Sequence, residues 1–351
     1  MVSQGNERTE PTARPAGGLA GAGRTATRLG TVSPKKSPSY LARAWRRFRR
    51  NRLSIVAMVV FVLIILLSYG APLVSSLVTK QSYDSQSLLT KYATPGSTVR
   101  ALSMSGPDAG KFVMQKHWLG SDELGRDVLT RLVYGGRISL SVAFITMVLA
   151  LTIGLLVGVT AGYYGGWVDS VLMRLVDVFI SVPGLFILIL ISTTVNNNKL
   201  ITNSTVFKNY GWLVLPFVIA ALSWTTISRL LRGEFLAARE RDYVEAARVL
   251  GAGNGRIIFR HILPNVMPII IVWASLVVPG LILTEAALSY LGFGVQIPTP
   301  SWGNMLSSAQ EYFTKAPYLV FVPGISIFVT VLMVNLMSNG LRDALDPRLN
   351  D

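Results

Sequence analysis

Long uncharged apolar windows alternate with short charged segments along this chain. Six windows of 20 or more residues contain no Asp, Glu, Lys or Arg. About 20 helical residues cross the hydrocarbon core of a bilayer, whereas a helix on a soluble core carries charges on one face. The pattern therefore predicts an all-α polytopic membrane protein with six transmembrane helices. The windows are Leu53–Thr79, Ile138–Val168, Val178–Asn198, Asn209–Ser228, Ile262–Thr284 and Ala316–Leu341.

Basic residues gather in two places beside these windows. Residues 1–52 hold 12 Lys or Arg against 2 Glu, which is +10 of the net charge of +15. Their densest run, Arg43–Arg52, directly precedes the first window, and Arg229–Arg260 carries seven Arg against four acidic residues. Positive flanks mark the cytoplasmic side and contact anionic lipid. We therefore expect cytoplasmic N and C termini and contact with membrane lipid, not a nucleic-acid-binding arm.

The windows divide the chain into segments of different composition. Residues 1–40 have no periodic apolar face and predict a disordered basic tail. Six segments follow from the charges and windows: this tail, a cytoplasmic basic flank (41–52), the first transmembrane helix (53–79), an extracytoplasmic loop (80–137), a five-helix core (138–341) and a cytoplasmic C-terminal tail (342–351).

The end of the extracytoplasmic loop has the pattern of a short amphipathic helix. Ser121 is a good helix cap, and Asp122 and Glu123 would fill the first turn, where the helix dipole favours negative charge. The pair Gly135-Gly136 would end this helix. We predict an interfacial helix on the outer surface. The alternative is a simple lead-in to the second span.

A few charged residues fall inside or beside the windows. Arg174 and Asp177 have the spacing of a local i,i+3 pair, although ionisable residues in a membrane also mark ion paths. Glu285 lies near the outer end of the fifth span, where it either hydrogen-bonds to a neighbouring helix or lines a solute path. Spans can kink at three Pro-Gly pairs, which begin at Pro183, Pro279 and Pro323.

The polar segment Arg229–Pro264, here called the elbow, carries the most informative pattern. Glu234–Leu250 keeps helical spacing, with an apolar stripe that includes Val244, Ala247 and Leu250. Gly251 follows where a helix ends in a left-handed turn, and a second helical run begins near Ile257. Pro264 suits the opening turn of the next span. A loop that only connected two spans would need no apolar face, so we expect another protein to hold it.

Several kinds of catalytic chemistry find no support in the sequence. No phosphate-binding loop of the form G-x-x-x-x-G-K-[ST] occurs. The chain has two histidines, His117 and His261, and no cysteine, so a His- or thiolate-based metal site is not expected. No pairing of a nucleophile with a base stands out, and we predict a non-catalytic protein.

The elbow resembles the cytoplasmic signature of permeases from binding-protein-dependent ABC importers. That signature is E-A-A, three residues, Gly, nine residues and I-x-L-P. Here Glu245-Ala246-Ala247 precedes Gly251 by three residues, and nine more lead to His261-Ile262-Leu263-Pro264, with His261 in place of the first Ile. Other segments are similar to the second permease subunit of dipeptide, oligopeptide and nickel importers: LGSDELGRDVLTRLVYGGRISL, AGYYGGWVDSVLMRLVDVFISVP, Pro298–Met305 and GLRDALDPRL.

The resemblance implies the architecture of a type I ABC importer permease in a bacterial or archaeal cytoplasmic membrane. Such a subunit forms half of a pore with a homologous permease. Two cytoplasmic subunits bind ATP and Mg, and an extracytoplasmic binding protein delivers the solute. The residues expected to couple this chain to an ATPase are Glu245, Ala246, Ala247, Gly251, Leu263 and Pro264.

The substrate and one other class of transporter stay open at this stage. The family transports di- and oligopeptides, and also nickel, glutathione or other small solutes. A self-sufficient secondary carrier would instead show inverted repeats, broken helices and midplane charges paired to ions. No such repeat is visible in the sequence, although the three Pro-Gly pairs could kink spans. A membrane anchor for a cytoplasmic enzyme would not need six spans.

Overall fold

The computed structural model describes residues 40–102, 110–198, 204 and 210–345. The chain divides into two units, Met1–Ser39 and Tyr40–Asp351, and only the second contains described residues. Residues 1–39 of the predicted tail, residues 103–109, most of the loop after Asn198 and the last six residues lie outside the described part.

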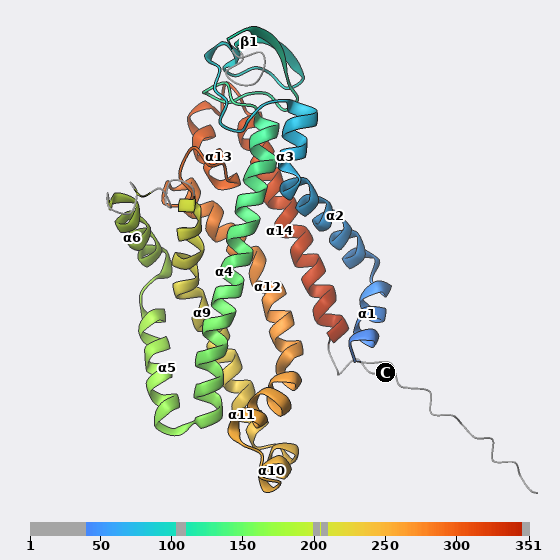
Figure 1. Cartoon of the computed structure of the whole chain (residues 1–351), viewed down its shortest axis with the longest axis vertical. Coiled ribbons are helices and arrows are strands. Elements are labelled where there is room, and N and C mark those ends of the chain that lie inside the picture. Colours follow the sequence, from blue (N-terminus) through green and yellow to red (C-terminus); the bar gives the residue numbers. More distant parts are fainter. Residues whose placement is uncertain (1–39, 103–109, 199–203, 205–209, 346–351) are drawn as a thin grey trace, which may run out of the picture. The chain divides into compact units, whose positions relative to one another are not determined.

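The described chain is mainly helical and carries one small β-hairpin (Figure 1). The α-helices are α1 Tyr40–Arg50, α2 Arg52–Tyr69, α3 Ala71–Val74, α4 Val128–Tyr164, α5 Gly166–Ser181, α6 Gly184–Asn197, α9 Val214–Arg239, α10 Asp242–Val249, α11 Asn254–Arg256, α12 Leu263–Tyr290, α13 Trp302–Ala309 and α14 Tyr318–Leu345. Shorter turns are η1 Ser75–Thr79, η2 Leu88–Thr90, η3 Gly211–Leu213, η4 Ile257–Ile262 and η5 Gln310–Tyr312, and the strands are β1 Ser97–Leu102 and β2 Phe112–His117.

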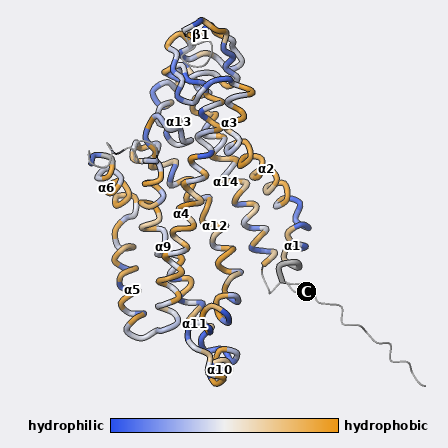
Figure 2. Tube along the Cα trace, in the orientation of Figure 1, coloured by the Kyte–Doolittle hydropathy of each residue, from blue (hydrophilic) through white to orange (hydrophobic). Residues whose placement is uncertain are grey.

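The predicted membrane-spanning character is confirmed. Within the described residues, five helical stretches are long and apolar enough to cross a bilayer: Arg52–Tyr69, Val128–Tyr164, Gly211–Arg239, Asn254–Tyr290 and Tyr318–Leu345. The tube coloured by hydropathy shows the apolar stretches along these helices (Figure 2). Helices α5 and α6 pass the same test only as a pair.

The third window, Val178–Asn198, is not one continuous helix, and its break falls at Pro183, where the sequence predicted a possible kink. Helices α5 and α6 meet at a bend of 82° inside this window. Val182 is extended and Pro183 follows it. Proline lacks the N–H that would continue the helix, and its ring disfavours a helical conformation of the preceding residue. Pro279 and Pro323, in contrast, lie inside α12 and α14 without ending them.

The predicted interfacial helix is also wrong, and the lead-in alternative is right. Asp127, not Ser121, caps α4, because its carboxylate accepts a hydrogen bond from the Thr130 N–H at 2.8 Å. The helix then runs unbroken through Gly135-Gly136 into the span. These glycines allow close packing and do not stop the helix, since a Cβ on Gly136 would lie 2.7 Å from the Trp302 ring.

Helices α4 and α9 pack tightly against each other in the core. Gly154, Gly158 and Gly162 stand four residues apart on the face of α4 that meets α9. A Cβ on Gly158 would lie 2.5 Å from the carbonyl oxygen of Ser228, so a larger residue would push the backbones apart. Small residues at this spacing are the usual device for tight helix contacts in membranes.

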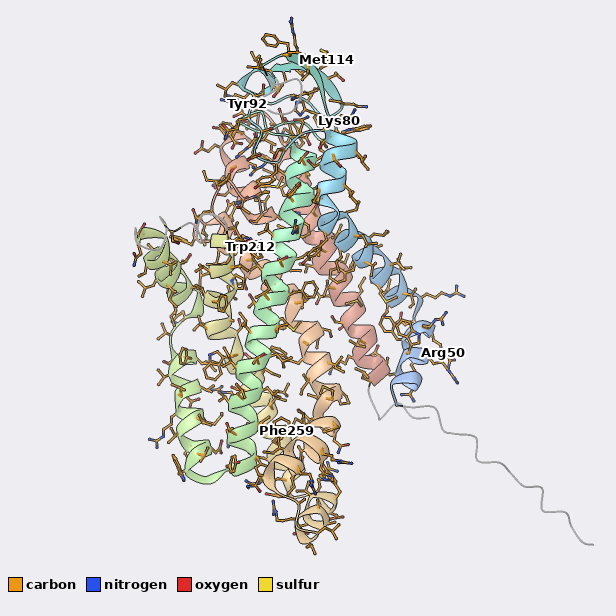
Figure 3. All side chains as sticks on the ribbon, viewed as in Figure 1. Arg50, Lys80, Tyr92, Met114, Trp212 and Phe259 are labelled. Atoms are coloured by element: carbon orange, nitrogen blue, oxygen red, sulfur yellow. The ribbon has the colours of Figure 1, made fainter. Side chains whose placement is uncertain are left out.

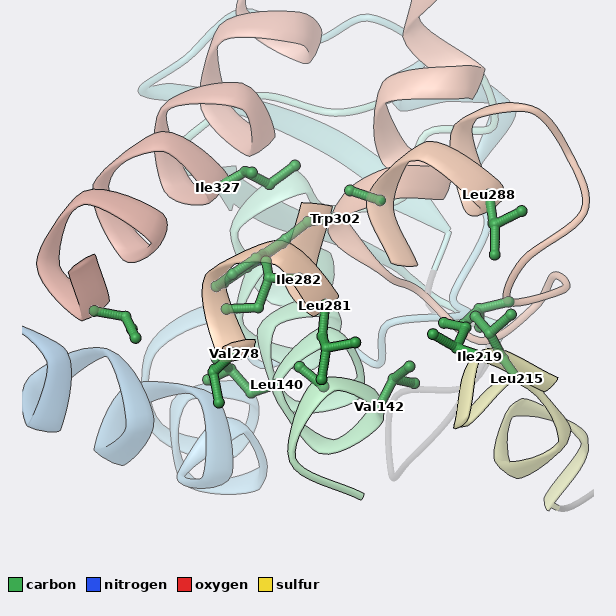
Figure 4. Close-up of a cluster of buried hydrophobic side chains, with 14 of the residues drawn as sticks. Leu140, Val142, Leu215, Ile219, Val278, Leu281, Ile282, Leu288, Trp302 and Ile327 are labelled. Carbon is green, nitrogen blue, oxygen red and sulfur yellow. The ribbon is translucent and has the colours of Figure 1, made fainter. Parts of the chain in front are cut away.

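A large apolar cluster joins α4, α9, α12 and α14 on the hairpin side of this pair (Figure 4). Leu140 from α4, Ile282 and Leu288 from α12 are fully buried in it. A second cluster surrounds Ile227, Leu231 and Phe235 nearer the elbow. The spans are therefore packed along their length, and the hairpin and the elbow project from opposite ends of α4.

Candidate functional site

The first part of the elbow consists of two helices, the end of α9 and α10, and not of one long helix. Helix α9 ends at Arg239, and Arg241 is extended before α10 begins at Asp242. The predicted continuous helix Glu234–Leu250 is therefore wrong. Asp242 and Glu245 fall in the first turn of the new helix, where the helix dipole favours negative charge, and Arg248 falls in the last turn.

Helix α10 has one buried and one exposed face. Val244 and Ala247 are buried in the cluster around Ile257 and Ile258. Leu250 was expected in the same stripe, but it is 87% exposed, as is Val249. A surface hollow follows the exposed face and is lined by Asp242, Glu245, Ala246, Arg248 and Val249. The charged and apolar side chains of this face have no cover within the described chain.

Gly251 makes the predicted left-handed turn, with φ of 79°. Its N–H donates to the carbonyl oxygen of Arg248 at 3.0 Å, and the N–H of Ala252 donates to that of Ala247 at 3.0 Å. These two bonds close the end of the helix in a Schellman motif. No atom lies within 4 Å of the place a Cβ would take, so the demand for glycine comes from the backbone conformation alone.

The return from the elbow into the membrane starts with an irregular turn. Asn254 begins a helical stretch that continues to Tyr290, with wider π-type bonding over Ile257–Ile262. Pro264 is at the start of α12, as predicted. Proline cannot donate a backbone hydrogen bond. The side-chain amide of the next residue, Asn265, donates to the His261 carbonyl oxygen at 2.7 Å. Leu263 is half-buried beside this turn, in the same cluster as Val244 and Ala247.

The elbow is held to the neighbouring spans at several points. The Tyr163 hydroxyl at the end of α4 donates to Asn254 Oδ1 at 2.9 Å. Arg239 Nη1 donates to the Tyr163 carbonyl oxygen at 3.4 Å. A Cβ on Gly162 would lie 2.6 Å from the carbonyl oxygen of Arg232, which shows how closely α4 and α9 approach here. The end of α4 is therefore bonded both to α9 and to the turn that follows Gly251.

The predicted pair of Arg174 with Asp177 is wrong. Asp177 pairs instead with Arg229 on α9, and Arg174 is exposed. A second carboxylate of α5, Asp169, holds Arg232 of α9 through two hydrogen bonds. The two carboxylates of α5, Asp169 and Asp177, thus hold this helix against α9. The facing residues of a packed neighbouring helix lie closer to them than the next turn of α5.

Glu285 is fully buried near the end of α12. Its Oε1 accepts a hydrogen bond from the Ser289 hydroxyl at 2.7 Å, and its Oε2 has no partner among the described residues. The side chains of Ser139 on α4 and Ser301 before α13 face the same carboxyl group. Glu285 therefore sits where three elements meet, and it does not line an open path in this structure.

The segment Lys80–Asp127, here called the head, contains a charged cluster that the sequence analysis did not anticipate. Asp122 Oδ2 accepts from Arg126 Nε at 2.6 Å and lies 3.6 Å from Arg131 Nε. Arg126 also donates to Glu123 at 2.9 Å. Burial and the neighbouring Asp122 raise the pKa of Glu123. Asp122 and Glu123 were predicted to lie in the first turn of a helix, but they are partners of the buried side chains of Arg126 and Arg131.

His117 is buried beside this cluster. Its Nδ1 lies 3.2 Å from Asp127 Oδ1, so the end of β2 is tied to the residue that caps α4. Among the described residues, no group of three His, Cys, Asp or Glu side chains is placed to hold a metal ion.

Comparisons with known proteins decide the family. Residues 154–351 match the family described as the binding-protein-dependent transport system inner membrane component. Residues 39–95 match the N-terminal transmembrane domain of oligopeptide transport permease C. The chain belongs to the binding-protein-dependent permease family. The elbow lies within the first match, and β1, β2 and the start of α4 lie between the two.

Three similar proteins are named for dipeptide, oligopeptide and glutathione transport. The dipeptide transport system permease protein DppC of Alkalihalophilus pseudofirmus is 36% identical over 90% of this chain and 94% of its own length. The oligopeptide permease OppC of Bacillus subtilis is 36% identical over 90% and 92%. The glutathione permease GsiD of Pectobacterium atrosepticum is 34% identical over 87% and 90%. Among solved structures, a chain of the inward-facing MetNI methionine ABC transporter has a TM-score of 0.47 at 18% identity, over 62% of this chain and 96% of that chain.

Proposed function

We propose that this permease is one of two membrane subunits of an ATP-driven importer for di- or oligopeptides. The proposal rests on the exposed α10, which stands between two packed spans in a member of the binding-protein-dependent family. The relatives named for dipeptide, oligopeptide and glutathione transport support peptides over nickel as the substrate class.

The exposed face of α10 is the surface we assign to an ATPase subunit. Val249 and Leu250 would lose their contact with water in a groove of the partner, and such burial contributes about 1.5–3 kcal/mol per side chain. Glu245 and Arg248 line the same surface hollow as Val249 and offer one charge of each sign. Ala246 lines the hollow between them without filling it.

Coupling would follow from the stiffness of the elbow. Ala247 anchors α10 in the core, and Gly251 closes its end. Leu263 and Pro264 begin α12 after the intervening turn of α11 and η4. Closure of two ATPases on bound ATP would move the docked helix as a unit, and the packed spans would convert that motion into alternating access.

A half-pore is consistent with an open apolar cavity of about 820 Å³ between α9, α12 and α14. Leu230, Pro268, Trp273, Leu276 and Arg342 are among its lining residues. A second, homologous permease would cover this side and complete the pathway.

The same proposal specifies the membrane in which the chain lies, its orientation and its partners. It lies in the cytoplasmic membrane of a bacterium or archaeon with both termini and the elbow inside, and the head outside. ATP and Mg bind to the partner ATPases, so this subunit carries no cofactor and no catalytic residues. A solute-binding protein delivers the peptide from outside, and the basic flank contacts membrane lipid.

The first experiment is purification of the tagged chain from its own host in mild detergent, followed by reconstitution in proteoliposomes. We expect a homologous permease and ATPases to co-purify, and peptide with its binding protein to stimulate both ATP hydrolysis and peptide uptake. Uptake by this chain alone, driven by a proton or sodium gradient, would contradict the proposal.

A further inference from the structure

The head has an exposed hairpin face that the proposed coupling mechanism does not use. The two strands pair antiparallel, with Arg100 opposite Met114 and Thr98 opposite Lys116. Alternate residues therefore point to the same side, and the outward set on each strand is exposed. This outward surface, here called the hairpin face, consists of Thr98, Arg100, Phe112, Met114 and Lys116, with Trp118 just beyond β2.

The hairpin face combines large apolar side chains with positive charges. Phe112, Met114 and Trp118 are 54%, 67% and 46% exposed. The Arg100 guanidinium lies 4.6 Å from the centre of the Phe112 ring, and the Lys116 ammonium lies 3.6 Å from that of Trp118. Each cation thus stands over an aromatic ring, an arrangement that limits the movement of both partners. Figure 3 shows Met114 on the hairpin, at the end opposite Phe259 of the elbow.

The exposed charged side chains of the head are mostly basic, because most of its acidic side chains pair with other residues of the head. Asp122 and Glu123 pair with buried arginines, and Asp127 pairs with His117. In the described part of the head, the exposed acidic residue is Asp84. The exposed basic residues are Lys80, Lys91, Arg100, Lys111 and Lys116.

The membrane does not account for this surface. Arg137 is an exposed charge on α4, and the 27 residues from there to Tyr164 are uncharged. At 1.5 Å per residue they span about 40 Å, the thickness of a whole bilayer with its headgroups. The start of α4 lies nine residues, or about 14 Å, further out. The hairpin is tied to that point through His117 and Asp127, so its apolar side chains face water and not lipid.

We propose that the hairpin face is a docking surface for the solute-binding protein of this importer, which would present carboxylates around an apolar patch. The inference rests on the proposed function, which places the head outside. A water-soluble partner with that surface would cover Phe112, Met114 and Trp118 and would pair with Arg100 and Lys116. Charge pairs of this kind speed association and fix the orientation of the partner.

The test uses the reconstituted complex in neutral-lipid nanodiscs and the binding protein that stimulates its ATP hydrolysis. Arg100→Glu and Lys116→Glu, singly and together, are compared with Lys315→Glu, an equal charge change at an exposed residue next to the head. We expect the double variant to raise the half-maximal concentration of binding protein about tenfold or more, with basal hydrolysis unchanged. Arg100→Lys keeps the positive charge and should retain most of the affinity. Added salt should raise the half-maximal concentration of binding protein for the native complex but not for the double variant.

Three results would overturn the inference. The first is a double variant whose half-maximal concentration of binding protein is unchanged. The second is an equal loss of affinity with Lys315→Glu. The third is a loss of affinity seen only in anionic vesicles of phosphatidylglycerol, which would assign the face to lipid. If the complex fails to assemble or lacks basal hydrolysis in its native form, the proposed function itself fails.

A second measurement does not depend on how the charge variants fold. The chain has no cysteine, so Met114→Cys places one thiol on the hairpin face. A thiol-coupled benzophenone at this position should, on illumination, join it to the binding protein whatever side chain the partner presents there, and the same label on Lys315→Cys should give far less product. No crosslink from Met114→Cys, in a complex that still responds to the binding protein, would also contradict the docking surface.

Discussion

The elbow and the head lie at opposite ends of α4 and are stabilised in different ways. The elbow depends on local backbone rules, with a helix dipole at Asp242, a glycine turn at Gly251 and a proline at the start of α12. The head depends on contacts between side chains of a loop and of the start of α4, such as Asp122 with Arg126 and Arg131. Local rules leave one face of α10 free for a partner, whereas the head uses most of its acidic groups to hold itself together.

The largest effect should come from removing the shared carboxylate of the head. Asp122→Ala leaves two buried arginines without their main partner, and breaking a buried pair costs about 3–5 kcal/mol of stability. We expect a clear fall in the unfolding temperature of the purified complex and faster hydrogen exchange in the hairpin. Asp84→Ala, at an exposed carboxylate, is the control and should change neither. If Asp122→Ala were as stable as Asp84→Ala, the contacts of Asp122 would not hold the head together, and the contrast with the elbow would fail.

The next largest effect concerns the turn at the end of α10. Gly251→Val forces a β-branched residue into a left-handed conformation, at a cost of about 1–2 kcal/mol. We expect peptide uptake per ATP hydrolysed to fall sharply while the complex still assembles. Gly253→Val is the matched control, since Gly253 has φ of −68° and open space around it. Equal coupling in both variants would mean that the turn has no role in transport.

The exposed apolar pair of α10 should affect binding and not folding. Leu250→Ser and Val249→Ser remove side chains that touch solvent, so we expect stability to change by less than about 0.5 kcal/mol. Co-purification of the ATPase should nevertheless weaken. Val244→Ser, on the buried face of the same helix, should instead lower stability. An ATPase that binds the Leu250 variant as well as the native chain would exclude this face as its docking surface.

The smallest effect should be at Arg174. Its side chain is exposed, and Asp177 pairs with Arg229, so Arg174→Gln should change the unfolding temperature very little. Arg229→Gln should have a slightly larger effect, up to about 1 kcal/mol, because exposed ion pairs contribute little. A larger loss with Arg174→Gln than with Arg229→Gln would restore the pairing that the sequence suggested.

The sequence predicts most of the elbow because its signals are local. The glycine after α10 and the proline before the next span act within one helical turn, and both were predicted correctly. The break at Arg241 was missed, since helical spacing continues across it. Leu250 has the spacing of a buried residue, but the change of direction at the break turns it outward.

The head could not be predicted in the same way. Ser121 and Asp127 are both good helix caps, and the choice between them depends on His117 and on the buried arginines, which lie elsewhere in the chain. Elsewhere in the chain, one sequence signal was not used and one was used only in part. The series Gly154, Gly158, Gly162 indicates the close contact with α9, and Pro183 marks the bend between α5 and α6.

The most direct test of the central claim places a single thiol on the exposed face of α10 in the assembled complex. Val249→Cys should crosslink to an ATPase subunit, with a yield that changes when ATP is bound, whereas Met114→Cys at the other end of the molecule should not reach that subunit. A Val249→Cys thiol that remains freely accessible to a water-soluble maleimide, in a complex that still couples ATP hydrolysis to uptake, would contradict the account.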